Sequence, residues 1–244
     1  MLLRPLLPAA LALAGLVTAA PLRAAPSLQA LQEALNSSSP EVLTTVLEPG
    51  KGLDLDEVAN RRLLLREQFP DASWTVQPGV PLKDGRATTQ ITVAGSREEG
   101  SYRFRFEAQQ QLVLGASGDR FNSQEVIRES SILRSGDSDL KVSLLIPDAV
   151  LTGQRYDLDV LIDEPLDGAI VAGGLVALTG QQVSALESPD LQLGALGGGG
   201  LFKTVQAPFT PGSQTWAVLL VHPKGLVSAT KRVRVVTDKA QLNP

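Results

Sequence analysis

The chain has 244 residues, with 22 lysines and arginines against 26 aspartates and glutamates, one histidine and no cysteine. A mildly acidic chain without a basic cluster is a poor partner for phosphate backbones, so we expect no nucleic-acid binding. The lack of cysteine excludes disulfides, thiolate metal sites and thiol catalysis, so the fold has to be held together by buried apolar surface.

Residues 1–24 have the pattern of a secretory signal peptide. Arg4 provides a positive start, residues 6–20 form a short apolar core, and small residues follow at a plausible cleavage point. The apolar core is shorter than the roughly 20 residues that a spanning helix needs, so we expect no transmembrane segment. Removing this segment takes away Arg4 and Arg23, which reduces the 22 basic residues to 20, against 26 acidic residues, a net charge of −6. We predict an exported protein, periplasmic or extracellular.

The first part of the remaining chain has helical periodicity. Apolar residues recur at spacings of three and four over 27–36, which predicts a first helix. A second, short helix is expected to begin at Ser39. The third helix has the clearest beginning, because Asp54 can cap it while Glu57, three residues on, reaches back to complete a capping box. Its apolar stripe, which includes Leu63, is expected to face the core.

After residue 70 the apolar period changes to two. Strands are predicted over 73–77, 88–93 and 101–107. In the last of these, Tyr102, Phe104 and Phe106 face one way, and residues 126–133 fit either a fourth strand or a helix. Three helices followed by a four-stranded antiparallel sheet predict an α+β domain over residues 25–135.

This order of elements resembles the cone-shaped fold of the nuclear transport factor 2-like superfamily and, more loosely, the cystatin-like folds. The resemblance covers residues 27–135 and rests on the element order and the aromatic strand. It implies a cone whose open end holds a small molecule. The lining residues would be Trp74, Ile91, Tyr102, Phe104 and Phe106. Enzymes of that superfamily place an Asp/His or Asp/Tyr pair inside the cone, whereas residues 25–135 contain no histidine and one tyrosine. The resemblance therefore implies binding more than catalysis.

The second half of the chain alternates in short segments and has no predicted helix. Residues 136–139 form a compact polar linker. Strand patterns follow over 140–146, 156–162, 170–178, 216–221 and 227–235. About seven short strands in roughly 100 residues are typical of an immunoglobulin-like β-sandwich. We predict such a sandwich over 140–237 and a tail over 238–244. The resemblance is architectural, since the Cys-Trp-Cys signature of antibody domains is absent.

His222 is the one histidine of the sequence. A hydrolase would place it beside a serine nucleophile, but no G-x-S-x-G sequence exists, and His222 ends a strand at a proline turn, where we expect it to be exposed. The chain is therefore predicted not to be an enzyme, with no catalytic residue and no cofactor.

Two further features leave alternatives open. The acidic residues of the second half raise the hypothesis of a calcium-stabilised sandwich, although a solvated outer face explains them as well and no metal ligand is assigned. These residues are Asp157, Asp159, Asp163, Glu164 and Asp167. The run Gly197–Gly200 fits a flexible connection or a mobile binding loop.

The function expected from these patterns is that of an exported, non-catalytic binding or protein-interaction protein of the cell envelope, with a protein partner that the sequence does not identify. The alternative is a small-molecule-binding or weakly catalytic cone domain carried by an immunoglobulin-like module. The two hypotheses differ in a structural feature, because the alternative requires a cavity in the first domain with a polar group converging inside it.

Overall fold

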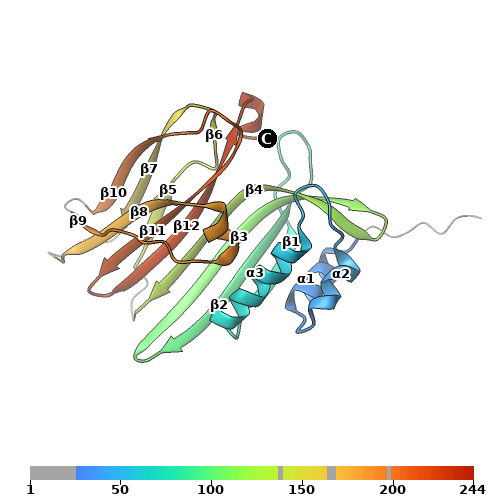
Figure 1. The fold of residues 1–244 in the computed structure, drawn as a ribbon, viewed down its shortest axis with the longest axis horizontal. Helices are drawn as coiled ribbons and strands as arrows, with labels where there is room; N and C mark the ends of the chain where they lie inside the picture. Colours follow the sequence, from blue (N-terminus) through green and yellow to red (C-terminus); the bar gives the residue numbers. More distant parts are fainter. Residues whose placement is uncertain (1–25, 137–139, 164–168, 197–198) are drawn as a thin grey trace, which may run out of the picture.

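The computed structural model describes residues 26–136, 140–163, 169–196 and 199–244 (Figure 1). Its α-helices are α1 (Leu28–Asn36), α2 (Leu43–Val46), α3 (Leu55–Gln68) and α4 (Gly180–Ala185), and its 3-10 helices are η1 (Pro40–Val42) and η2 (Lys239–Gln241). Its strands are β1 (Ser73–Pro78), β2 (Thr89–Glu99), β3 (Tyr102–Ser117), β4 (Arg120–Ser135), β5 (Val142–Leu145), β6 (Ala149–Leu151), β7 (Arg155–Ile162), β8 (Val171–Leu178), β9 (Gly194–Leu196), β10 (Gly200–Gln206), β11 (Gly212–His222) and β12 (Gly225–Val236).

Most of these strands belong to one large sheet. Its order is β1-β2-β3-β4-β12-β11-β8-β9, and β6 pairs with the end of β12 to make nine strands. The β6–β12 pair is parallel and the others are antiparallel. A second sheet of three strands, in the order β10-β7-β5, packs beside the β12–β11–β8 part of the large one (Figure 1).

The predicted fold class, an α+β domain with three helices followed by an all-β sandwich, is wrong. The described residues are 52% strand and 19% helix, and one nine-stranded sheet runs through both halves of the chain. The halves join where β4 pairs with β12, placing Ser131 opposite Thr230 although they are 99 residues apart. Alternation in a sequence shows which residues share a face of a strand, but it does not show which strand pairs with an open edge.

Two clusters of buried side chains lie on opposite faces of this sheet. The first core lies between the helices α1–α3 and strands β1–β4, and includes Leu43 and Phe69. The second core lies between the three-stranded sheet and strands β8, β11 and β12, and includes Leu158 and Val233. The predicted signal segment and residues 137–139 of the predicted linker lie outside the described residues.

Helix α3 begins as predicted but buries a different face. The carboxylate of Asp54 accepts hydrogen bonds from the backbone N–H groups of Asp56 and Glu57, at 2.9 and 3.2 Å. The Glu57 side chain does not complete a capping box, because it pairs with Arg61. Leu63, predicted to face the core, is 56% exposed.

The face that α3 buries includes an arginine in place of Leu63. The Arg62 side chain is 6% exposed and donates to the backbone carbonyls of Leu35 and Ser37, at the end of α1. Burial, and to a smaller extent the charge of Arg66, lower the pKa of the Arg62 guanidinium. The last carbonyls of a helix have no partner within it, and Arg62 supplies donors to two carbonyls at this end, where Arg66 also donates to the Leu35 carbonyl at 3.5 Å.

Helix α4 was not predicted. Thr179 caps it: the Thr179 hydroxyl accepts from the N–H of Gln182, and the Gln182 side chain accepts from the N–H of Thr179. This T-x-x-Q signal was present in the sequence. The helix ends at Leu186, whose φ of 50° is left-handed and whose side chain packs against the first core. The residues between β8 and β9 thus extend to the helices of the first half.

Two local expectations need correction. Strand β2, predicted to end at residue 93, continues to Glu99, so the β2–β3 turn is at Gly100. His222 is buried, at 8% exposed, and its Nδ1 accepts a hydrogen bond from the N–H of Lys224. Over the ranges described above, no helix has the length and apolarity to cross a membrane.

Replacing Arg62 by alanine is expected to destabilise the protein by about 1–3 kcal/mol, because the Ser37 carbonyl loses its donor and the Leu35 carbonyl keeps only the longer bond from Arg66. Urea denaturation measures the loss. Glu67→Ala, an exposed position on the same helix, is the control and should change the free energy of unfolding by less than about 0.5 kcal/mol. Equal effects of the two substitutions would show that Arg62 does not hold α3 to α1.

Stability is also expected to fall in alkaline solution because of Tyr156. Its hydroxyl donates to Gln214 at 2.8 Å and accepts from the Trp216 indole at 2.9 Å, inside the second core. Burial raises the pKa of Tyr156, an effect that the bond from Trp216 opposes in part. A raised folded-state pKa gives stability that is complete below the unfolded value of about 10 and is lost as the pH rises through the folded value.

Urea denaturation at pH 8 and at pH 10.5 tests this expectation. The wild type should lose more stability between the two values than Tyr156→Phe, which has no phenol to ionise at that position. Identical losses would contradict the assignment.

Candidate functional site

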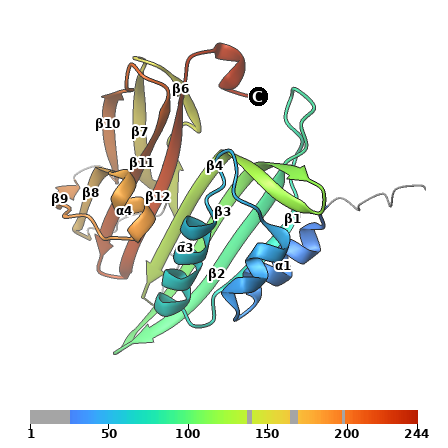
Figure 2. The same ribbon diagram turned by 45° about the vertical axis from the view of Figure 1, so that its right-hand side comes forward.

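A cleft lies on the helix side of the large sheet, between α3 and α4. Both helices lie over this face, α3 over β2 and β3 and α4 over the strands of the second half (Figure 2). The cavity between them has a volume of about 340 Å³ and is lined by α3, α4 and strands β1–β4, β11 and β12. Ligand pockets in proteins generally span about 300–1,000 Å³, so this cleft has room for a small molecule.

The middle of the floor is built from small and polar residues that the strand register aligns in one row. Ala108 of β3 is opposite Ser131 of β4, which is opposite Thr230 of β12, which is opposite Ala217 of β11. The hydroxyl groups of Ser131 and Thr230 are 2.7 Å apart and hydrogen-bonded. Because no large side chain occupies this row, the sheet stays open between the two helices.

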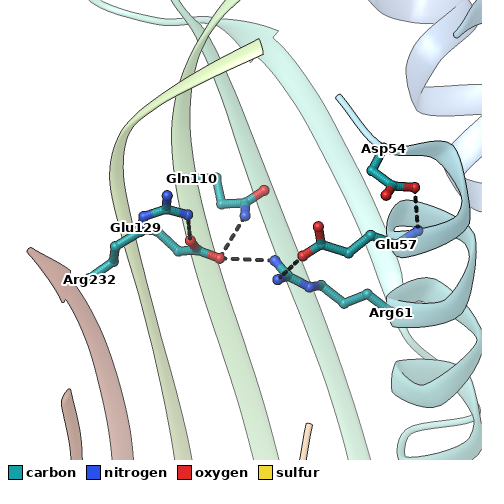
Figure 3. A network of polar contacts seen from close by, with 6 residues as sticks. All are labelled: Asp54, Glu57, Arg61, Gln110, Glu129 and Arg232. Carbon is teal, nitrogen blue, oxygen red and sulfur yellow. Dashed lines mark hydrogen bonds and ion pairs between the residues drawn. The ribbon is translucent and has the colours of Figure 1, made fainter. Parts of the chain in front are cut away.

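The next row along the sheet has charged residues (Figure 3). Glu129 of β4 accepts hydrogen bonds from three side chains. The donors are Gln110 at 2.8 Å, Arg61 at 3.1 Å and Arg232 at 3.3 Å. The backbone pairing of β4 with β12 stops at Lys231, so the Glu129–Arg232 ion pair joins the two strands at the first position beyond it.

Helix α3 supplies Arg61 to this row. The cap at Asp54 fixes where α3 begins, and a spacing of four residues puts Glu57 and Arg61 on one face of the helix. Arg61 therefore bonds to Glu57 at 3.0 Å with one guanidinium nitrogen and to Glu129 with the other (Figure 3). The arginine connects the helix layer to the floor of the sheet.

A β-bulge beside Glu129 changes the register between β3 and β4. Before it Gln111 is opposite Arg128, and after it Leu112 is opposite Val126, so Ile127 is the additional residue. The carbonyl of Ile127 accepts from the buried Arg234 side chain at 3.1 Å. Arg234 of β12 thus provides a hydrogen bond to the backbone carbonyl that the bulge leaves without a strand partner.

The charged row has more donors than acceptors. Both oxygens of Glu129 are occupied, whereas Arg232 donates to Glu129 alone among the described residues. A guanidinium has five N–H groups, so most of those on Arg232 have no protein partner there. The Nε atoms of Arg61 and Arg232 are buried without a hydrogen-bond partner in the described structure. The row therefore has hydrogen-bond donors that no described residue uses.

The apolar side of the cleft lies under α3 and contains part of the predicted cone lining. Trp74, Ile91 and Phe106 line the cavity. Phe104 lies instead under the Arg97 guanidinium, 4.9 Å from its ring centre, and Tyr102 is 59% exposed near the hairpin end. Neither Phe104 nor Tyr102 belongs to the lining. That Trp74, Ile91 and Phe106 bind a ligand stays a prediction.

The sequence reasoning missed Arg61, Glu129 and Arg232. Arg61 had a local signal, because it follows Glu57 by four residues on a helix whose beginning was predicted. Glu129 and Arg232 had none, since they meet through a strand pairing that joins residues 103 positions apart.

The other candidate positions do not form a cluster of metal-ligating side chains in the described ranges. No group of three or more aspartate, glutamate, histidine or cysteine side chains lies close enough there to hold a metal ion. Asp157 accepts from Thr204 and Asp163 from Ser143, on the outer face of the small sheet. Glu164, Asp167 and residues 197–198 of the glycine run lie outside the described residues.

Residues 137–236 match a family described as a domain of unknown function (DUF8623). The matched segment includes β5–β12 and α4, and therefore Thr230 and Arg232 of the cleft. Glu129 and the residues of α3 lie outside it, so the cleft is built from both the matched segment and the part of the chain before it. No curated protein matches the chain.

Replacing Glu129 by alanine is expected to cost about 1–3 kcal/mol, because two arginines are then left facing each other without a carboxylate. The figure lies below that for a fully buried pair, since Glu129 and its partners Arg61 and Arg232 are 21%, 24% and 32% exposed. Urea denaturation measures the cost, and raised salt should reduce it by screening the repulsion.

Glu98→Ala provides the matched control. Glu98 pairs with Arg103 at 3.8 Å, and the two side chains are 76% and 65% exposed. Its removal should cost less than about 0.5 kcal/mol. A Glu129→Ala protein as stable as Glu98→Ala would show that the charged row contributes nothing to the fold.

Proposed function

We propose that this protein is an exported, non-catalytic binding protein and that the cleft between α3 and α4 is its binding site for a small molecule. The observation that carries the proposal is the cavity itself, about 340 Å³ in volume, with an apolar side under α3 and a charged row at its floor. A mostly apolar pocket with a few converging polar groups is the usual form of a ligand site.

The arrangement favours binding over catalysis. None of the residues that line the cavity is a histidine, and the single histidine of the chain is held at the end of β11. The Ser131 and Thr230 hydroxyls bond to each other, and neither is hydrogen-bonded to a carboxylate or an imidazole among the described residues. An activated nucleophile requires such a base within hydrogen-bond reach.

A protein partner in the envelope is the second proposal, and a different surface supports it. On the outer face of the three-stranded sheet, Leu145 and Phe202 flank Asp159 in one row, with exposed fractions of 57% and 63% for the two apolar side chains. Exposed apolar side chains beside an open sheet edge suit contact with another chain.

Filling the cleft is expected to abolish ligand binding. The measurement is the fluorescence of 1-aminonaphthalene, an uncharged probe small enough for the cleft, whose emission shifts to the blue in apolar sites, titrated with the intact protein. Ala108→Trp places an indole in the row between the helices and should weaken probe binding at least tenfold.

The control is Ala116→Trp, at an exposed position of the same strand outside the cleft, which should bind the probe like the wild type. Circular dichroism establishes that both variants are folded. Undiminished binding by folded Ala108→Trp, or no binding by the wild type, would overturn the cleft as the site and leave the surface of Phe202 as the better candidate.

A further inference from the structure

We infer that the ligand of the cleft is an anionic amphiphile, a single aliphatic chain ending in a carboxylate, with the carboxylate bound by Arg232 and the chain lying under α3. This inference rests on the proposed binding function and adds the chemical class of the ligand. Three properties of the cleft support it: its hydrogen-bonding capacity, the apolar character of one side, and its size.

The hydrogen-bonding capacity selects for an acceptor. The charged side chains of the lining balance in number, with Glu57, Glu129 and Glu187 against Arg61, Arg62 and Arg232. Their hydrogen bonds do not balance. Glu129 already accepts three bonds, Glu57 is paired with Arg61, and Glu187 is exposed to solvent. Arg62 is used by the backbone at the end of α1, whereas Arg232 uses one donor among the described residues.

A cationic ligand would find the central carboxylate occupied by two arginines. An acceptor-bearing ligand finds the free N–H groups of Arg232, which is 32% exposed and therefore reachable. Arginine binds carboxylates with two parallel N–H···O bonds, and such charge-assisted bonds are about twice as strong as neutral ones. The charged row therefore favours a carboxylate over an alcohol or an amine.

The rest of the cleft selects for an aliphatic chain. The lining continues from the charged row toward the first core, where most of its side chains have no hydrogen-bonding group. These include Leu65, Ile91, Val93, Phe106 and Leu112. A polar ligand would lose its hydration there without receiving bonds in exchange. An apolar chain instead gains free energy with each methylene group that it buries.

The volume limits the length of this chain. A cavity of about 340 Å³ corresponds to roughly ten water volumes of about 30 Å³ each. A ligand of about a dozen non-hydrogen atoms is the largest that fits without opening the helices, which corresponds to a medium-chain acid such as decanoic acid and excludes a two-chain lipid.

Competition against 1-aminonaphthalene tests the inference with three ligands that share one chain and differ in charge. Decanoate should displace the probe from the wild-type protein at a concentration at least tenfold lower than 1-decanol does, and decylammonium should be the weakest. Arg232→Gln should reduce the advantage of decanoate over decanol to less than about threefold, while probe binding persists. Arg155→Gln, an exposed arginine outside the cleft, should keep the full advantage.

The outcomes separate this inference from the proposed function. If the wild type binds the probe and decanol competes as well as decanoate, the cleft is a binding site but its ligand is not anionic. If decylammonium competes best, the acceptor argument is wrong. If the wild type does not bind the probe, the proposed function fails. If Arg232→Gln does not fold, competition by the three ligands with the wild-type protein still tests the inference, because it measures the charge preference without any variant.

Discussion

The fold and the cleft both depend on the backbone pairing of β4 with β12. Six residues of β12, from Leu226 to Lys231, pair with six of β4 and join two halves that would otherwise end in open sheet edges. An unpaired edge in the middle of a protein leaves N–H and C=O groups without partners, which makes this pairing strongly favoured once both strands are formed. Its register also decides which side chains meet, and so it places Arg232 next to Glu129.

The two faces of the large sheet are covered by different elements. On one face the three-stranded sheet covers β8, β11 and β12 and makes the second core. On the other face α1–α3 cover β1–β4, α4 lies over the second half, and between them the floor is made of Ser131, Thr230 and Ala217. These small residues give little apolar surface to bury, so no helix packs flat over them. The cleft therefore results from the small residues that occupy this face of the sheet where β4 pairs with β12.

Local patterns predicted individual elements well and their assembly poorly. The Asp54 cap marked the beginning of α3, and the alternation around Phe106 marked β3. The face of α3 was mistaken at Leu63, because Arg62 is buried against carbonyls of α1, a contact that hydropathy does not reveal. The T-x-x-Q sequence that caps α4 indicates a helix, but it lies in a part of the chain that was predicted to be all β. Among the residues that line the cleft, Trp74, Ile91 and Phe106 were predicted as lining residues, whereas Glu129 and Arg232 were not.

The sequence by itself determined what is local: where helices begin, which residues of a strand share a face, and which chemistry a chain without cysteine and with a single histidine lacks. The tertiary structure decided which strands pair, that the helices of the first half and α4 face each other across one sheet, and that Arg61, Glu129 and Arg232 form one charged row. The reason is physical. Periodicity records the environment of each residue along its own element, whereas the partner across an open edge is selected by the burial and hydrogen bonding of the whole chain at once.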